Sequence, residues 1–245
     1  MVHKEPYFPT RFPLIAITLI ILLQPLALQV KAGDHISLSY DVRPSTVENG
    51  GTIEISFSAE TRDSHWPNRW YIVEVSCVVY RFGVLEKVLV HETPRFVNIY
   101  SWSGEYVPSK KGSYEIRFYV KAGLYNSSTG YWEEFETEEG SAQVIVKDHT
   151  ELKLITSENP IKVRLGSAFD VKIRLRDVEE DVLLTGRKVR VKIGEDELEA
   201  ESGDLLVITA LERGSFRIEA WYDGETYLLP SSSNVIKVEV YSIPE

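Results

Sequence analysis

The chain has 245 residues, of which 43% are hydrophobic and 11% aromatic, a content too high for an intrinsically disordered protein. Its formal net charge is −10. This acidic balance argues against nucleic acid and anionic lipid as partners, because both require a positive protein surface. Proteins, sugars and cations remain as partner classes.

The first 32 residues form a hydrophobic leader. Residues 1–11 are weakly basic, and residues 13–23 form an uncharged apolar run. Small or β-branched residues at Val30 and Ala32 fit signal-peptidase cleavage after Ala32, which would give a secreted protein. The alternative is an uncleaved membrane anchor over residues 12–30, which is just long enough to cross a bilayer. A buried core helix is a poorer third interpretation, because no other part of the chain has a helical pattern to pack on it.

Residues 33–148 have the pattern of β-strands separated by turns. Alternation of apolar and polar residues predicts strands at 35–42, 52–59, 71–79, 84–91, 113–122, 131–139 and 143–147. The strand at 71–79 has the strongest alternation and is expected to be central. Residues 43–51 form a cluster of turn residues, and residues 96–106 are aromatic and irregular.

A short linker at 148–150 precedes a second unit with the same pattern and fewer aromatic residues. Strands are predicted at 152–155, 169–175, 189–193, 205–210, 216–221 and 235–241. Residues 178–185 are expected to form a charged loop, and residues 194–196 a tight turn. Strands at this spacing without helices predict a β-sandwich for each unit.

A short motif occurs twice, about a hundred residues apart. It starts with a basic residue and Gly-Ser, and it leads into an alternating strand at 111–117 and again at 213–219. The repetition predicts an all-β fold of two tandem sandwiches, at 33–148 and 149–245, behind the 1–32 leader. It argues against the alternative of a single larger barrel.

Residues 185–191 and 213–224 carry the patterns G-x-x-V-x-V and G-x-[YF]-x-[IV]-x-A-x-Y-x-G, followed by an aromatic residue and a serine-rich stretch. In this respect residues 151–240 resemble bacterial-type immunoglobulin-like repeats, while the first unit is similar only in outline. The resemblance implies immunoglobulin-like sandwiches of the kind found in surface, adhesion and multi-module proteins. It also implies structural roles for Gly214, Phe216, Ile218, Tyr222 and Gly224. The family motif contains no catalytic residue.

Cys77 is the only cysteine in the sequence, which excludes an intramolecular disulfide. Its apolar surroundings in the sequence predict a buried core thiol. Glutamine, cysteine and methionine are scarce, while glutamate, lysine and arginine are plentiful. This composition is typical of hyperthermophile proteins and favours a heat-loving archaeal source.

The sequence predicts no enzyme, no cofactor and no metal site. None of the five histidines has a second His or Cys at metal-ligand spacing, and the common catalytic and phosphate-binding motifs are absent. A hydrolase whose triad forms only in space is a distant alternative. Acidic clusters at 133–139 and 179–181 are interpreted as solvated surface. Of the two, Glu179, Glu180 and Asp181 are the better candidates for calcium.

Tryptophans concentrate in the first unit. Trp66, Trp102 and Trp132 are candidate binding residues, because exposed aromatic rings serve both sugar and protein recognition, although packing in the sandwich is the alternative for each. Trp70 is expected to fill the core. Asn126 begins an Asn-Ser-Ser glycosylation acceptor in a predicted turn.

These observations favour an exported cell-surface structural or interaction protein without catalysis. Its expected partner is a protein or a glycan at the cell surface, and the leader would tether it if retained. The alternative is a carbohydrate- or ligand-binding accessory module that uses the aromatic loops of the first unit. The sequence leaves the oligomeric state open.

Overall fold

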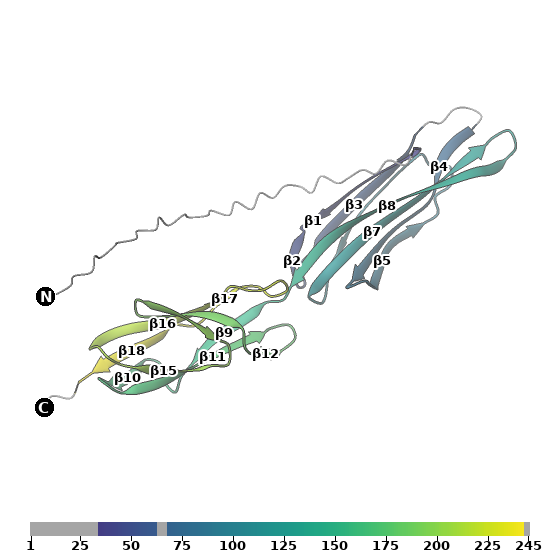
Figure 1. Cartoon of the computed structure of the whole chain (residues 1–245). Helices are drawn as coiled ribbons and strands as arrows, with labels where there is room; N and C mark the ends of the chain where they lie inside the picture. The colour runs from purple at the N-terminus through teal and green to yellow at the C-terminus, as the bar shows by residue number, and fades with distance from the viewer. Residues whose placement is uncertain (1–33, 63–67, 243–245) are drawn as a thin grey trace, which may run out of the picture.

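The computed structural model describes residues 34–62 and 68–242. The predicted leader and Trp66 lie outside these residues. The described chain is all-β and forms two sandwiches stacked end to end in an elongated molecule (Figure 1). Within the described residues, no helix has the length and apolar content needed to cross a membrane.

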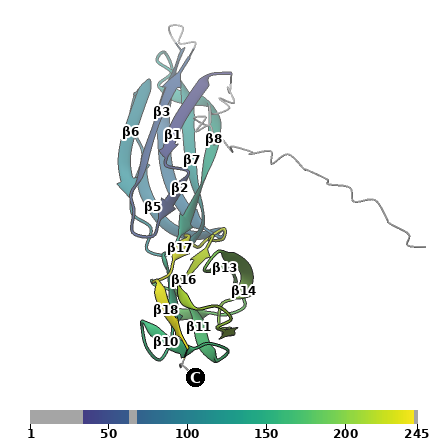
Figure 2. The same ribbon diagram turned by 90° about the vertical axis from the view of Figure 1, so that its left-hand side faces the viewer.

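The first sandwich packs a three-stranded sheet, in the order β1-β3-β6, against a five-stranded sheet, in the order β2-β8-β7-β4-β5. Its strands are β1 Ile36–Arg43, β2 Thr46–Glu48, β3 Ile53–Thr61, β4 Asn68–Arg81, β5 Val84–Glu92, β6 Ile99–Tyr106, β7 Gly112–Asn126 and β8 Tyr131–Lys147. The strands β4, β7 and β8 are the longest and extend from the junction with the second sandwich to the far end (Figures 1 and 2).

The second sandwich is built from one sheet in the order β10-β18-β16-β13-β14, with β17 attached to β16, and another in the order β12-β11-β15, with β9 attached to β11. Its strands are β9 Thr150–Ile155, β10 Ile161–Arg164, β11 Ala168–Asp177, β12 Val182–Leu184, β13 Lys188–Ile193, β14 Asp196–Glu201, β15 Leu205–Thr209, β16 Gly214–Tyr222, β17 Ser231–Ser232 and β18 Ile236–Tyr241.

Each sandwich has its own hydrophobic core, formed by the inward-facing residues of alternating strands. The strand predicted at 71–79 is central, since β4 pairs with β5 on one side and β7 on the other. Its residues Val75, Cys77 and Val79 are completely buried. Trp70 is also buried in the first core, as expected.

The repeated motif has the same structural role in both sandwiches. Gly112 and Gly214 begin β7 and β16 with φ angles of 146° and 123°, a region that favours glycine. Four residues further on, Ile116 and Ile218 are completely buried in their respective cores. Both strands are interior strands of their sheets.

Several details of the strand prediction are wrong, and the short strands β10 and β17 were not predicted. The 43–51 turn cluster contains β2, which pairs with β8, and the 178–185 loop contains β12. The irregular segment at 96–106 contains β6, whose eight residues pair with β3 without interruption. The strand β14 was missed because its sequence, Asp-Glu-Leu-Glu-Ala-Glu, is mostly charged. The alternation signal requires apolar residues on one face.

The two strands predicted at 131–139 and 143–147 are one strand, β8, with Gly140 in its interior. A Cβ atom at this position would lie 2.2 Å from a ring carbon of Tyr40, so glycine is required where the aromatic ring crosses the strand. The sequence predicts two strands here because an isolated glycine such as Gly140 more often marks a turn than the interior of a strand.

The burial of Cys77 leads to a prediction about its reactivity. Burial raises the pKa of this thiol to about 12, so little thiolate is present near neutral pH. We expect a thiol reagent to label Cys77 only when the protein unfolds, with a labelling rate that rises with urea concentration. Rapid labelling of the folded protein in the absence of urea would contradict this burial.

Candidate functional site

An aromatic cluster lies on the first sandwich, near the end that is remote from the second. We call it the aromatic patch; its members are Tyr71, Phe96, Tyr125, Trp132 and Phe135. Trp132 contacts the other four rings at centroid distances between 5.2 and 6.4 Å, and it is stacked with Phe96. The patch is assembled from β4, β7, β8 and the loop between β5 and β6.

Two backbone features form the patch. Gly123 of β7 pairs with Phe135 of β8, and a Cβ atom on Gly123 would lie 2.8 Å from the ring of Trp132 and 2.9 Å from the ring of Phe135. The absence of a side chain therefore lets both rings lie on the sheet. Phe96 has a φ angle of 58°, which is strained for an aromatic residue, and strain of this kind is concentrated at functional sites.

The aromatic patch is partly open to solvent. Phe96 and Phe135 are each 53% exposed and Trp132 is 37% exposed, while the neighbouring Tyr131 is 73% exposed. Lys121 places its ammonium group 4.6 Å from the centroid of Phe135, within cation–π distance. Contiguous apolar exposure of this kind makes the aromatic patch a candidate interaction surface.

Among the described residues, the structure places Trp102 and Trp132 in different sheets of the first sandwich. Trp66 lies outside the described residues. Trp102 is on β6, in the opposite sheet from Trp132, where it is partly buried and packs on Phe57 of the core. Of the two described candidates, Trp132 is the one that lies in an exposed aromatic cluster. Phe96 and Phe135 were missed because their sequence context has no feature that separates exposed from core aromatics.

Asn126 ends β7 at the hairpin turn next to the aromatic patch. Its amide nitrogen donates to Glu133 at 2.6 Å, and its carbonyl oxygen accepts from the backbone N–H of Ser128 at 2.9 Å. These bonds form an Asx-type turn at the tip of the hairpin. Glycosylation of Asn126 stays a prediction.

The junction between the sandwiches is the second candidate region. Lys111, just before β7, extends its ammonium group into a cluster of carboxylates from the junction and the second sandwich. It contacts Asp148 at 3.3 Å, Glu180 at 2.8 Å and also Asp177. Asp148 and Asp177 are only 1% and 0% exposed. Buried carboxylates require a partner of this kind, because burial of an unpaired charge is costly.

The ionisation of these groups reflects the competition between burial and pairing. Burial acts to lower the pKa of Lys111, but the hydrogen bonds to Asp177, Glu180 and Asp148 outweigh it and raise this pKa above its ordinary value. Burial raises the pKa of Asp148, and this effect exceeds the opposing hydrogen bonds from Asn49 and Lys111. Lys111 is therefore the fixed cation of the junction.

The carboxylates at the junction could bind a cation, but the ammonium group of Lys111 already pairs with them. Oxygens of Asp148, Asp177 and Glu179 lie within 4.8 Å of one another. The candidates from the sequence diverge instead of converging: Glu180 contacts Lys111, Glu179 contacts His149, and Asp181 contacts Arg176. Lys111 already provides positive charge where a metal ion would have to bind.

The alternation of buried residues in the sequence extends to both aspartates of this cluster. Val144, Val146 and Asp148 are all buried and lie two residues apart in turn. Leu175 and Asp177 are also buried and also lie two residues apart. Both aspartates therefore occupy inward-facing positions of alternating strands. An acid at such a position predicts a buried carboxylate with a specific partner.

The segment that joins the sandwiches is not a free linker. The N–H of Asp148 donates to the carbonyl of Tyr227 at 3.0 Å, and the carbonyl of Asp148 accepts from the N–H of Leu229 at 2.8 Å. Asn49 of the first sandwich donates to the Asp148 carboxylate at 2.7 Å. Phe82 of the first sandwich also makes an edge-on contact with Tyr227, with 5.7 Å between the ring centroids. Contacts from both sandwiches thus hold the junction.

His149 also connects the two sandwiches. Its Nδ1 lies 2.5 Å from Glu179 of the second sandwich, and its Nε2 lies 3.1 Å from Glu48 of the first. The hydrogen bond to Glu179, followed by that to Glu48, raises the pKa of His149 above its ordinary value of 6.5. A protonated imidazole can donate to both carboxylates at once, whereas a neutral ring can donate to only one.

The raised pKa predicts a pH dependence. The contribution of His149 to stability is complete below pH 6.5 and is lost as the pH rises through the raised pKa of the folded protein. We therefore expect the variant H149Q to lose stability relative to the natural protein at pH 5.5, and to differ from it much less at pH 9, in urea unfolding. An equal difference at both pH values would contradict the ion-pair role of His149.

Comparison with known proteins gives matches only among solved structures. No protein-family profile matches the sequence. No curated protein is significantly similar to it. The all-β sandwich architecture of both units agrees with the fold that the resemblance of residues 151–240 to immunoglobulin-like repeats implies.

Among solved structures, the chain is similar to fibronectin(III)-like modules of Clostridium thermocellum CbhA, with 17% identity, 84% of this chain and 94% of that chain covered, and a TM-score of 0.31. It is similar to the D1–D4 ectodomain fragment of ICAM-5, with 14% identity, coverages of 84% and 54%, and a TM-score of 0.47. For the Yersinia pseudotuberculosis adhesin InvE the identity is 12%, the coverages are 84% and 61%, and the TM-score is 0.29. These values carry no argument about function.

Proposed function

We propose that the protein is an exported, non-catalytic spacer at the cell surface, in which two immunoglobulin-like sandwiches are joined rigidly and hold an interaction surface at a fixed position. In this proposal the first domain comprises residues 33–148 and the second comprises residues 149–245. Export is supported by the hydrophobic leader in the sequence.

The observation that carries the proposal is the set of contacts between Lys111 and the carboxylates of Asp148, Asp177 and Glu180, which we call the clamp. Interfaces between domains are often mobile unless they are large or specifically held. Here a lysine of the first sandwich contacts the buried carboxylate of Asp148, at the connection, and that of Asp177, in the second sandwich. Such a connection suits a spacer, because a spacer must keep its ends at a defined separation.

The absence of catalysis is part of the proposal, and the surroundings of the three histidines within residues 34–62 and 68–242 support it. His35 pairs with Glu136, His91 lies 4.0 Å from Glu74, and His149 lies between two glutamates. These are contacts of ion pairs. A catalytic histidine of a hydrolase would instead be positioned against a nucleophile.

A second candidate function is the binding of a carbohydrate or another ligand, with the aromatic patch as the site. Its support is the exposure of Phe96, Trp132 and Phe135. The argument against it is that the ring of Trp132 packs on Gly123 and stacks with Phe96, so the aromatic faces that a sugar would use are engaged within the protein.

Surface exposure on intact cells tests the spacer proposal. We expect an external protease to remove the native protein from intact cells, and an antibody against the C-terminal sandwich to bind those cells before the treatment. Recovery of the native protein in the cytosolic fraction would contradict export. A tryptophan-emission titration with soluble polysaccharides tests the second candidate: a change that is present in the natural protein and absent in W132F would support carbohydrate binding.

A further inference from the structure

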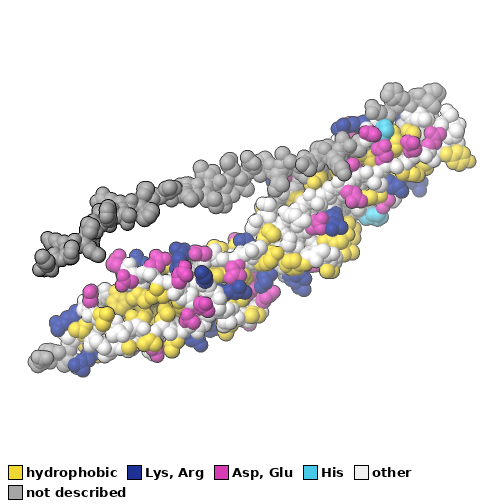
Figure 3. Space-filling model, viewed as in Figure 1, with side chains coloured by type: hydrophobic (Ala, Val, Ile, Leu, Met, Phe, Trp, Pro, Cys, Tyr) yellow, Lys and Arg dark blue, Asp and Glu magenta, His cyan; other side chains and the backbone are white. Residues whose placement is uncertain are grey.

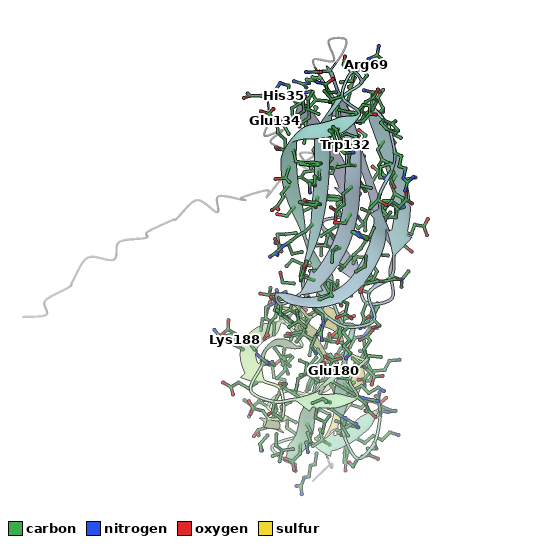
Figure 4. All side chains as sticks on the ribbon, turned by 90° about the vertical axis from the view of Figure 1, so that its right-hand side faces the viewer. His35, Arg69, Trp132, Glu134, Glu180 and Lys188 are labelled. Carbon is green, nitrogen blue, oxygen red and sulfur yellow. The ribbon has the colours of Figure 1, made fainter. Side chains whose placement is uncertain are left out.

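The chain enters the first sandwich at the end that carries the aromatic patch, but on the core side of the five-stranded sheet, whereas Phe135 and Tyr71 of the patch lie on its outer face. His35, which precedes β1, stacks on Trp70 with 4.6 Å between the ring centroids, and its Nδ1 lies 2.8 Å from Glu136. Glu136 directly follows Phe135 of the aromatic patch in β8. The start of the described chain and the patch thus share one end of the sandwich. Figure 4 shows His35, Arg69, Trp132 and Glu134 at this end.

The last described strand lies at the opposite end of the molecule. The strand β18 closes the second sandwich, and the chain leaves it on the side away from the first sandwich (Figure 1). The elongated molecule therefore has a leader end, which carries the aromatic patch, and a C-terminal end more than one sandwich away. A tether at the N-terminus would place the leader end against the membrane.

The connection between the predicted anchor and the first sandwich is very short. If residues 12–30 are retained in the bilayer, only residues 31–33 separate the anchor from Asp34. Fully extended, the four steps from Val30 to Asp34 span at most about 14 Å. The leader end of the first sandwich must then lie within roughly that distance of the hydrocarbon core, which is about twice the thickness of the headgroup region of one leaflet.

The side chains at the leader end fit the headgroup region. Exposed hydrophobic side chains, drawn in yellow, occur at this end of the molecule (Figure 3). Aromatic rings with polar edges prefer the boundary between water and hydrocarbon, and Tyr131 and Trp132 are of this kind. Lys121 and the exposed Arg69 can reach phosphates with their charged ends. The nearby acids Glu133 and Glu134 disfavour an anionic bilayer, so the chemistry fits zwitterionic lipid.

We infer that the aromatic patch, together with Tyr131, contacts the headgroup region of a zwitterionic bilayer in which the leader is anchored, and so fixes the orientation of the spacer on the membrane. The inference rests on the proposed export and on retention of the leader. It assigns the partner of the aromatic patch and places the second sandwich at the end remote from the membrane.

Quenching by brominated lipid tests this contact. The full chain is reconstituted in phosphatidylcholine vesicles in which a fraction of the lipid carries bromine near the headgroup. The difference in emission between the natural protein and W132F isolates the signal of Trp132 from the other tryptophans. We expect bromine to quench this difference signal at least twofold, and we expect a triple variant, F96S, Y131S and F135S, to abolish most of the quenching.

A second triple variant is the matched control. Leu205, Val207 and Leu211 are also exposed apolar residues, but they lie in the second sandwich. Their replacement by serine should leave the quenching of Trp132 unchanged. Circular dichroism confirms that both triple variants are folded.

Three results would overturn the inference. In the first, the protein floats with the vesicles but Trp132 is not quenched, so the anchored spacer stands and the membrane contact falls. In the second, polysaccharide and not lipid changes the Trp132 signal, which assigns the patch to carbohydrate. In the third, the native chain begins at Gly33, so export stands but the tether is absent.

Discussion

Replacement of Lys111 by methionine is expected to lower the free energy of unfolding by about 3–5 kcal/mol, because it leaves Asp148 and Asp177 buried without their cation. Methionine keeps much of the length of the side chain, so loss of charge dominates the effect. Urea unfolding at pH 7 measures the change, and we expect the transitions of the two sandwiches to separate.

The charge mechanism has its own controls. In the triple variant K111M, D148N and D177N, the carboxylates are neutral, so more than half of the lost stability should return. Lys188, whose side chain is 85% exposed and 3.8 Å from Glu199, is the matched surface lysine, and K188M should change the stability by less than about 0.5 kcal/mol. A loss below about 1 kcal/mol for K111M would contradict the clamp.

Replacement of Trp70 by alanine is expected to cost about 3–5 kcal/mol, because this residue is 2% exposed and its removal leaves a cavity at the leader end of the first core. It would also remove the ring on which His35 stacks. Differential scanning calorimetry should show the loss as a lower transition temperature. In the K111M background, where the two transitions are expected to separate, only that of the first sandwich should shift.

The tryptophan of the aromatic patch provides the comparison. Trp132 is 37% exposed and one aromatic pair contributes about 0.5–1.5 kcal/mol, so W132A should cost about 1–2 kcal/mol, less than W70A. Equal losses for W70A and W132A would mean that the aromatic patch is part of the core, and its assignment as an interaction surface would then fail.

The strands could be predicted from sequence where one face of a strand is apolar. In β3, Ile53, Ile55 and Phe57 alternate with polar residues, and both the strand and its buried face followed from this pattern. The strand β14 has no such face and was missed. Its position depends on pairing with β13, a long-range contact that a local pattern does not contain.

The candidate sites were harder to predict, because exposure depends on tertiary neighbours. Nothing local to Trp102 and Trp132 shows that the first packs on Phe57 while the second lies over Gly123. The clamp brings Lys111 and Asp177 together across 66 positions of the sequence. Its carboxylates could have been suspected from their inward-facing positions, but the identity of their cation required the structure.

The central claim is that the two sandwiches move as one rigid body, and nitrogen-15 relaxation of backbone amides tests it most directly. The protein that begins at Gly33 is a suitable sample, since it lacks the hydrophobic leader. We predict that amides of both sandwiches fit a single, strongly anisotropic rotational diffusion tensor, and that K111M divides it into two. Separate diffusion tensors for the two sandwiches of the natural protein would contradict the claim.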